Sequence, residues 1–197
     1  MCNLYNVRAT KAEIRSYFQA SEVWERNIRM DKDYVAPRKP GLVVRDGGAG
    51  RVLDTMAWGF PFNGKPVTNV RNYSSPFWKT ALANSARRCL VPVTEFQEWS
   101  VEPDRDTGKK RPYWFSLPSR SIFAFAGIWR PTDGDPVFSF LTCGYEGDPT
   151  AHVVGAIHPK AIPVILHEED YDRWLRAELD EALTLACAFP SQLMAVR

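Results

Sequence analysis

The sequence predicts one α+β domain built on a mainly antiparallel β-sheet with short flanking helices, for three reasons. The chain has 197 residues, a length at the upper end of one ordinary domain, and no internal repeat or change of composition marks a boundary. Hydrophobic residues make up 45% of the chain, enough for a sizeable core. Strand-like runs follow one another and helical segments stand apart, which is typical of α+β proteins and not of a regular βαβ alternation. We therefore expect a single domain over residues 1–197.

The first part of the chain is predicted to hold one helix followed by two strands. Residues Lys11–Gln19 have helical apolar spacing, and Thr10 with Glu13 forms the pattern of a capping box. Prolines interrupt Asp31–Pro40, which predicts an extended loop. Two strand-like runs come next, separated by a glycine-rich turn. They are Leu42–Arg45 and Arg51–Trp58.

The rest of the chain is predicted to hold a long loop, further strands and C-terminal helices. Prolines and glycines recur in Gly59–Pro76, so we expect a long ordered loop, a kind of segment that is often functional. Ser75 is placed to cap a helix that starts at Pro76, and the charged segment Glu102–Arg111 predicts another loop. The predicted strands are Cys89–Val93, Tyr113–Leu117, Ile122–Ile128, Val137–Thr142 and Pro163–Leu166, and helices are expected from Glu168 to Ala188.

Charge, cysteine usage and missing motifs exclude several classes of protein. The formal net charge is only +2, so nucleic-acid binding would need a local concentration of basic side chains. No cysteine pair has C-x-x-C spacing, no histidines have metal spacing, and phosphate-loop, dinucleotide-binding and G-x-S-x-G motifs are missing. We therefore expect no metal and no cofactor. Apolar neighbours predict buried free thiols at Cys89, Cys143 and Cys187. We find no secretory signal or membrane-length apolar run, and expect a cytoplasmic protein, nucleoid-associated if the source is bacterial.

Cys2 is the most informative residue for chemistry. A small side chain at position 2 normally permits removal of Met1, which would leave an α-amine and a thiol on one residue. Such a 1,2-aminothiol reacts with an aldehyde in two steps: the amine forms a Schiff base, and the sulfur then closes a thiazolidine ring intramolecularly. An α-amine pKa of ~7.7–8.0 leaves a usable uncharged fraction at neutral pH. The alternative, a small buried residue at the start of a strand, stays open on position alone.

Three polar residues are candidates to assist Cys2. An unperturbed histidine has a pKa near ~6.5, which makes His158 a candidate for proton transfer at neutral pH. Glu98 stands next to Trp99 in the sequence, and partial desolvation there would make its carboxylate more basic. Asn69 offers an amide that can hold an oxygen or an amine. Each has an ordinary structural alternative, namely a turn-capping histidine, a solvated loop acid and a loop asparagine.

Basic and aromatic residues near these candidates suggest a nucleic-acid surface. Arg8, Arg71 and Lys160 each lie beside a candidate reactive residue in the sequence, and if they converge they form a phosphate-binding rim. Trp58 and Trp99 are candidates for stacking on unpaired bases. The apolar strand around Trp58 favours a core position. For Trp99, which borders the charged loop, stacking and core packing both stay open.

Several motifs together resemble the SRAP family, the SOS-response-associated peptidase-like proteins. They cover nearly the whole chain and are specific in combination, although each alone is weak. The motifs are MCNLY at the start, VAP, MAWGF, NVR at Asn69–Arg71, RRCLVPVTEFQEW, FLT at Phe140–Thr142 and IHPKAIPVIL. The resemblance implies a barrel-like β core. It also implies a protein of the DNA damage response whose N-terminal cysteine cross-links to the ring-opened aldehyde of an abasic site in single-stranded DNA.

Carried over position by position, the resemblance implies roles for individual residues. The implied catalytic residues are Cys2 as nucleophile, Asn69 as supporting amide, Glu98 as acid/base and His158 as proton carrier. The implied DNA contacts are Arg71, Lys160, Trp99 and Thr142. Two segments depart from the family's usual pattern. Glu95 adds a carboxylate that would repel phosphate if exposed, and prolines and Lys160 stand in an altered segment after His158.

The expected function is therefore covalent protection of a DNA lesion. The expected partner is single-stranded DNA containing abasic sites, bound by a monomer without contact to a membrane, and the same site is expected to remove Met1, with lyase activity as a further possibility. Two other functions stay open. One is a cysteine peptidase or amidase that pairs Cys2 with His158, and the other is a non-covalent single-strand-binding module in which Cys2 has no role.

Overall fold

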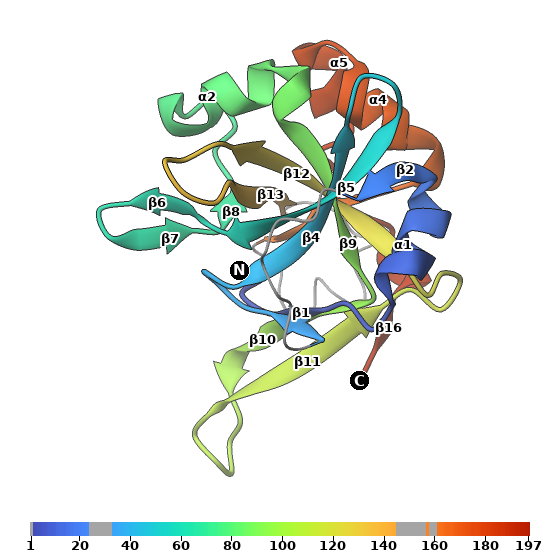
Figure 1. Cartoon of the computed structure of the whole chain (residues 1–197). Coiled ribbons are helices and arrows are strands. Elements are labelled where there is room, and N and C mark those ends of the chain that lie inside the picture. Colours follow the sequence, from blue (N-terminus) through green and yellow to red (C-terminus); the bar gives the residue numbers. More distant parts are fainter. Residues whose placement is uncertain (1, 24–32, 145–156, 158–160) are drawn as a thin grey trace.

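Five strands form the centre of the molecule, and the computed structural model describes residues 2–23, 33–144, 157 and 161–197 of the chain. The five strands are β4 (Pro40–Asp46), β5 (Arg51–Trp58), β9 (Arg88–Val93), β12 (Phe123–Arg130) and β13 (Val137–Cys143). They pair in the order β13, β12, β9, β4, β5, and β5 pairs again with β13 (Figure 1). The ring of strands is therefore closed, and every pairing in it except β5 with β13 is antiparallel.

Short strands extend this barrel at its edges. They are β2 (Ala20–Val23), β8 (Asn69–Val70), β14 (Ile162–Pro163) and β15 (Ile165–Leu166). Strand β2 runs parallel to β5, and β8 runs parallel to β13. Strands β14 and β15 are antiparallel to β13 and β12 respectively. Strand β13 thus holds β8 and β14 as well as its two neighbours in the barrel.

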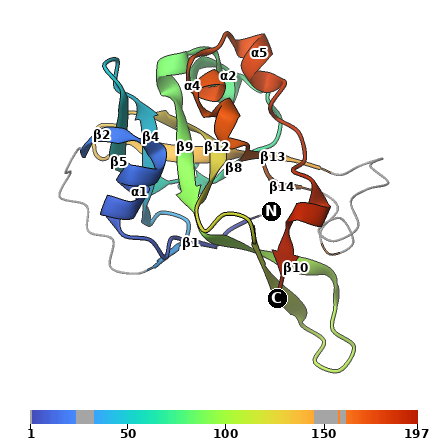
Figure 2. The same cartoon turned by 90° about the vertical axis from the view of Figure 1, so that its right-hand side faces the viewer.

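A second sheet lies beside the barrel and carries the start of the chain. Its strands, in spatial order, are β16 (Ala195–Val196), β11 (Lys110–Ser116), β10 (Glu95–Pro103), β1 (Tyr5–Asn6) and β3 (Tyr34–Val35), all antiparallel. The far ends of β10 and β11 project from the body as a hairpin (Figures 1 and 2). The N-terminal strand is therefore held between two partners, β10 and β3.

The helices are short, as predicted, and two of them have the predicted caps. They are α1 (Lys11–Phe18), α2 (Pro76–Ala83), α4 (Tyr171–Arg176) and α5 (Leu179–Leu183), with 3₁₀ turns at Ser85–Arg87, Glu168–Asp170 and Ser191–Leu193. The Thr10 hydroxyl accepts from the Glu13 amide, and the Glu13 carboxylate accepts from the Thr10 amide. Ser75 Oγ accepts from the Phe77 amide. Among the described residues, no helix is both long and apolar enough to span a bilayer.

Aromatic side chains fill the space between the barrel and the second sheet. Tyr5 of β1 packs edge-on against Trp58 with ring centroids 5.3 Å apart, and Phe125 lies 4.8 Å from Phe140. Gly41 permits this packing, because a Cβ at that position would lie 2.5 Å from the Tyr5 hydroxyl. The N-terminal strand is therefore an integral part of the core.

The predicted fold class is confirmed, and the predicted loop Gly59–Pro76 is more ordered than expected. It contains a hairpin of β6 (Phe60–Phe62) and β7 (Lys65–Val67), followed by β8. The hairpin turns at Asn63 and Gly64, whose φ angles of 49° and 73° are those that an Asn-Gly pair favours. The prolines obscured this strand pair, but they are tolerated because the hairpin is an isolated two-stranded sheet.

The cysteine predictions are only partly right. All four cysteines are free thiols, and Cys89 is fully buried as expected. Cys143 is half-buried and Cys187 is exposed, so the prediction of burial is wrong for Cys187. Apolar neighbours in sequence misled the prediction there, because Leu185 and Phe189 face the core while Cys187 between them faces solvent.

Candidate active site at the N-terminal cysteine

Cys2 is fully buried at the entry to β1, and the pairing of β1 with β10 fixes its place. Tyr5 pairs with Phe96, and the Gln97 amide donates to the Leu4 carbonyl at 2.9 Å. The Cys2 thiol donates weakly to the same Leu4 carbonyl at 3.5 Å. The backbone at Leu4 and Tyr5 is therefore bonded to β10, which brings Cys2 to the part of that strand that carries Glu98.

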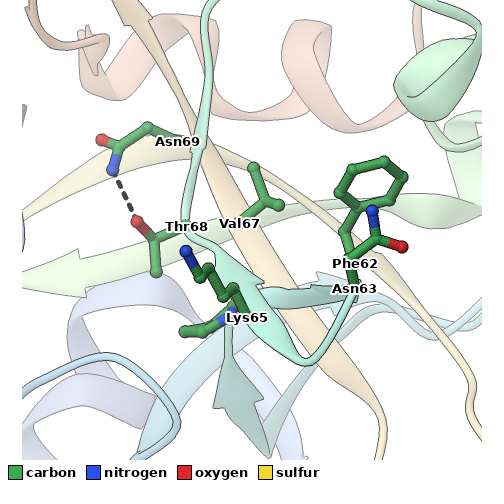
Figure 3. Close-up of a pocket in the computed structure, with 7 residues that line it drawn as sticks. Phe62, Asn63, Lys65, Val67, Thr68 and Asn69 are labelled. Carbon is green, nitrogen blue, oxygen red and sulfur yellow. Dashed lines mark hydrogen bonds between the residues drawn. The ribbon is translucent and has the colours of Figure 1, made fainter.

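Asn69 contacts Cys2 directly from the other side. It lies on β8, which β13 holds by parallel pairing of Asn69 with Phe140. Its Nδ2 donates to the Cys2 carbonyl at 2.9 Å. The same nitrogen donates to Thr68 Oγ1 at 2.7 Å (Figure 3). Its Oδ1 is buried without a hydrogen-bond partner in the described part of the chain. The amide therefore holds the Cys2 backbone and keeps an acceptor for a further donor.

Glu98 is the acid of the site. The side chain is fully buried on β10, so the interpretation as a solvated loop acid is wrong. Burial raises the pKa of Glu98 to about 7, although the positive charge of the amino terminus acts to lower it. A carboxyl with a pKa near neutrality can both accept and return a proton at working pH.

The Cys2 thiol is protonated in this environment. Burial raises the pKa of the thiol well above its usual range, and the negative charge of Glu98 raises it further. A buried neutral thiol is a weak nucleophile. Any reaction at the sulfur therefore requires a base that takes its proton, and Glu98 is close enough to influence it electrostatically.

The second carboxylate of β10, Glu95, has a structural environment. It accepts hydrogen bonds from Asn6 Nδ2 at 2.6 Å and Arg197 at 2.6 Å, and it forms an ion pair with Arg8 at 2.7 Å. Burial acts to raise the pKa of Glu95, but the contacts with Arg197, Asn6 and Arg8 outweigh it and lower the pKa. The carboxylate is buried and paired, so the repulsion of phosphate expected for an exposed Glu95 does not apply.

Three of the predicted DNA contacts lie at the surface. Arg71 is exposed and directly follows β8. Trp99 is 38% exposed and directly follows Glu98 on β10. The Arg8 side chain is 57% exposed while it pairs with Glu95. Trp99 is adjacent to Glu98 on β10, and Arg71 is two residues after Asn69, so both are near site residues in the sequence.

Two predicted DNA contacts are enclosed instead. Trp58 has no exposed surface, and its Nε1 donates to the Thr68 carbonyl at 3.1 Å. The core interpretation of Trp58 is therefore right, and this conformation offers no indole face to a base. Thr142 is also buried, and its hydroxyl donates to the Val70 carbonyl at 3.4 Å. This hydroxyl is committed to holding β8 against β13.

His158 and Lys160 lie outside the described residues. Strand β14, which follows them in the sequence, pairs with the end of β13, where Thr142 opposes Pro163.

Thr68 is a further member of the site, which the sequence motifs did not indicate. Its hydroxyl accepts from Asn69 and its carbonyl accepts from Trp58. The only signal was its place next to Asn69 in the predicted loop. Thr68 and Asn69 also line a cleft of about 540 Å³ together with Phe62, Lys65 and Val67 (Figure 3).

The fold and the site define a class of protein. The chain combines a closed β barrel, a second sheet that holds the N-terminus, and a buried cysteine at position 2 between an amide and an acid of near-neutral pKa. The chain belongs to the SRAP family, described as SOS response associated peptidase, whose family model matches residues 1–197.

Comparisons with individual proteins agree with this assignment. The chain is 29% identical over 154 residues to the Bacillus subtilis abasic site processing protein YoqW, a match that covers 72% of the chain. It is 25% identical over 185 residues to the protein YoaM of the same organism and the same description, covering 89% of the chain and 79% of the relative. The match spans only 65% of YoqW, just under two thirds of its length.

Solved structures share the fold. A protein of Bordetella bronchiseptica superimposes with a TM-score of 0.77 at 22% identity and covers 99% of this chain and 98% of its own. A protein of Bacteroides thetaiotaomicron gives a TM-score of 0.77 at 21% identity, with 99% of this chain and 90% of that one covered. At these identities the similarity concerns the fold alone.

Proposed function

We propose that the chain, after removal of Met1, captures abasic sites in single-stranded DNA by a covalent bond to Cys2. The observation that carries this proposal is the convergence of Cys2, Asn69 and Glu98 in one buried site. Two relatives, YoqW and YoaM, are described as abasic site processing proteins. An abasic sugar in its ring-opened form presents the aldehyde with which an N-terminal aminothiol reacts.

The first step joins the amine to the aldehyde. Glu98 accepts a proton from the Cys2 ammonium, because its pKa of about 7 lies close to that of an α-amine at ~7.7–8.0. The amine nitrogen bonds to the aldehyde carbon and gives one proton to the carbonyl oxygen, which takes a second proton and leaves as water. The product is a Schiff base, and the carboxyl that took the proton supplies one to the departing oxygen.

The second step closes the ring. The Cys2 sulfur bonds to the imine carbon, its proton leaves through Glu98, and the imine nitrogen gains one proton. The net reaction converts an aldehyde and an aminothiol into a thiazolidine and one water. Because the thiol is protonated and buried, the amine reacts first and the sulfur follows intramolecularly.

The remaining residues bind and position the DNA in this proposal. Asn69 holds the Cys2 carbonyl, so that the amine and sulfur keep a fixed direction. Arg71 and Trp99 contact a phosphate and an unpaired base near the reacting sugar. His158 carries protons and Lys160 contacts phosphate, as the family resemblance implies. The same site removes Met1 by hydrolysis of the peptide bond to Cys2.

The test is an adduct assay with a single-stranded oligonucleotide that contains one abasic site. The wild type is expected to give a band that survives denaturation without a reductant. Cys2→Ser is the matched control, because it keeps the α-amine and loses the sulfur. It is expected to give an adduct only when borohydride traps the Schiff base. Blocking the aldehyde with an alkoxyamine beforehand is expected to abolish both adducts.

Other outcomes identify the alternative functions. Cleavage of a test peptide without any DNA adduct would show a cysteine peptidase. Undiminished DNA binding by Cys2→Ala, again with no wild-type adduct, would show a non-covalent binding module.

A further inference from the structure

Thr68 has a rigid backbone at the edge of the site. Its carbonyl accepts hydrogen bonds from Trp58 Nε1 at 3.1 Å and from the Phe140 amide at 3.4 Å. Trp58 is fully enclosed in the aromatic core, and Phe140 belongs to β13 of the barrel. The position of Thr68 is therefore determined by the most ordered part of the fold.

The Thr68 hydroxyl, which this backbone holds in place, orients the side-chain amide of Asn69. It accepts from Asn69 Nδ2 at 2.7 Å (Figure 3), while the same nitrogen donates to the Cys2 carbonyl at 2.9 Å. An amide nitrogen has two hydrogens, and two acceptors in different directions fix both of them. The orientation that results leaves Asn69 Oδ1 as the buried acceptor.

We propose that Thr68 is a positioning residue, whose hydroxyl locks the Asn69 amide in the orientation that holds Cys2 for reaction. The inference rests on the proposed function for its kinetic consequence. The chain of contacts runs from Trp58 in the core through Thr68 and Asn69 to Cys2, so the barrel itself sets the place of the reactive residue.

The location of Thr68 separates this role from a role in stability. Thr68 is half-buried and lines the open cleft beside Lys65 and Val67. Replacement by valine keeps the shape and removes the acceptor, and water from the cleft can then reach the freed amide hydrogen. The fold loses little, but the amide is no longer restrained and Cys2 samples more orientations.

The kinetic test compares Thr68→Val, Thr68→Ser and a control, Ser139→Ala. Ser139 Oγ donates to the Val67 carbonyl at 2.7 Å, so its loss disturbs the same segment without touching the amide. Single-turnover adduct formation is measured over a range of DNA concentrations. Thr68→Val is expected to lower the maximal rate about threefold to tenfold, the equivalent of one ordinary hydrogen bond, with unchanged half-saturating DNA concentration. Thr68→Ser is expected to restore the rate.

Three results would overturn the inference: a wild-type rate in Thr68→Val, an equal loss in Ser139→Ala, or a Thr68→Ser variant as slow as the valine variant. A second readout does not depend on DNA. The side-chain NH₂ signals of Asn69, assigned with Asn69→Asp, are expected to exchange faster with water in Thr68→Val. If the wild type forms no adduct, the proposed function fails, and unchanged amide exchange would separately refute the positioning role.

Discussion

Glu95 and Glu98 lie three residues apart on β10, and their environments are opposite. Both are buried. Glu95 is surrounded by Asn6, Arg8 and Arg197, and its pKa is lowered. Glu98 lies beside the buried Cys2, and its pKa is raised to about 7. Residues three apart on a strand face opposite sides of the sheet, so one strand supplies both environments.

The Glu95 carboxylate stabilises the fold, whereas the Glu98 carboxyl is suited to chemistry. The contacts of Glu95 stabilise its charged form, and its proton is not available near neutrality. Glu98 is buried where a negative charge is unfavourable, so its ionised form lowers the stability of the fold. In return, the carboxyl exchanges its proton at working pH. The same residue type therefore has two roles, and only the surroundings distinguish them.

The largest expected effect is on the rate of adduct formation. Glu98→Gln keeps the size of the side chain and removes the proton acceptor, and we expect the single-turnover rate to fall about a hundredfold. Glu95→Gln is the matched control and is expected to keep the rate within about twofold where it is folded. Quenched time courses with abasic single-stranded DNA measure both. Equal losses in the two variants would remove the distinction between the two carboxylates.

The pH dependence of adduct formation is expected to reflect the ionisation of the Glu98 carboxyl. Because its pKa is raised to about 7, the ionised base that accepts the amine proton forms as the pH rises through neutrality. The wild-type rate should therefore rise between about pH 6 and pH 8, and this includes the ionisation of the α-amine at ~7.7–8.0. Glu98→Gln should keep only the amine dependence. A profile of identical shape in both proteins would contradict the assignment.

The two variants are expected to change stability in opposite directions. A carboxyl whose pKa is raised from 4.5 to about 7 on folding stabilises the protonated fold, and this advantage is lost as the pH rises through 7. Glu98→Gln should therefore have a higher free energy of unfolding than the wild type at pH 8, by up to about 3 kcal/mol, and should match it near pH 4.

Glu95 should show the reverse dependence. Its pKa is lowered, so its contribution is present at neutral pH and is lost as the pH falls through the folded pKa. We expect Glu95→Gln to cost about 1–3 kcal/mol at pH 7 and less near pH 3. Chemical denaturation at several pH values tests both signs. A higher free energy of unfolding in Glu95→Gln at neutral pH would show that the contacts of the Glu95 carboxylate do not stabilise the fold.

The smallest expected effect comes from Arg197. Its side chain is 62% exposed and shares Glu95 with Arg8. Arg197→Ala should cost about 1 kcal/mol of unfolding free energy, because Asn6 and Arg8 still satisfy the carboxylate. The adduct rate should stay unchanged. Slower adduct formation at wild-type stability would show that Arg197 and the Glu95 carboxylate that it contacts belong to the reactive site.

The sequence predicted the barrel strands because their apolar runs are nearly continuous. Arg51–Trp58 was predicted with its observed bounds, and Val137–Thr142 within one residue. These strands are buried on both faces, which gives a strong apolar signal. The capping box at Thr10 was equally clear, because it depends on two residue types at a fixed spacing.

Strand β10 could not be predicted from its own residues. Two glutamates and a glutamine occupy Glu95–Glu98, a composition that strands usually avoid. Partners distant in sequence, such as Asn6 and Arg197, satisfy the buried Glu95, and burial beside Cys2 desolvates Glu98. Burial and partners of this kind arise only from the tertiary fold.

The candidate site was predicted better in its residues than in its contacts. Cys2, Asn69 and Glu98 were singled out on residue type and family resemblance, but the orientation of Asn69 by Thr68 depends on the pairing of β8 with β13. Trp58 shows the converse. Its strand favoured the core, and its indole supports the site from inside without facing it.

The most direct test of the covalent chemistry is the intact mass of the protein after incubation with a short abasic single-stranded oligonucleotide. We expect one product, equal to the chain without its initiator methionine plus the oligonucleotide minus one water, with the junction mapped to the N-terminal cysteine peptide. A chain that keeps Met1 and gains no mass under these conditions would contradict the account, as would an adduct mapped to any other residue.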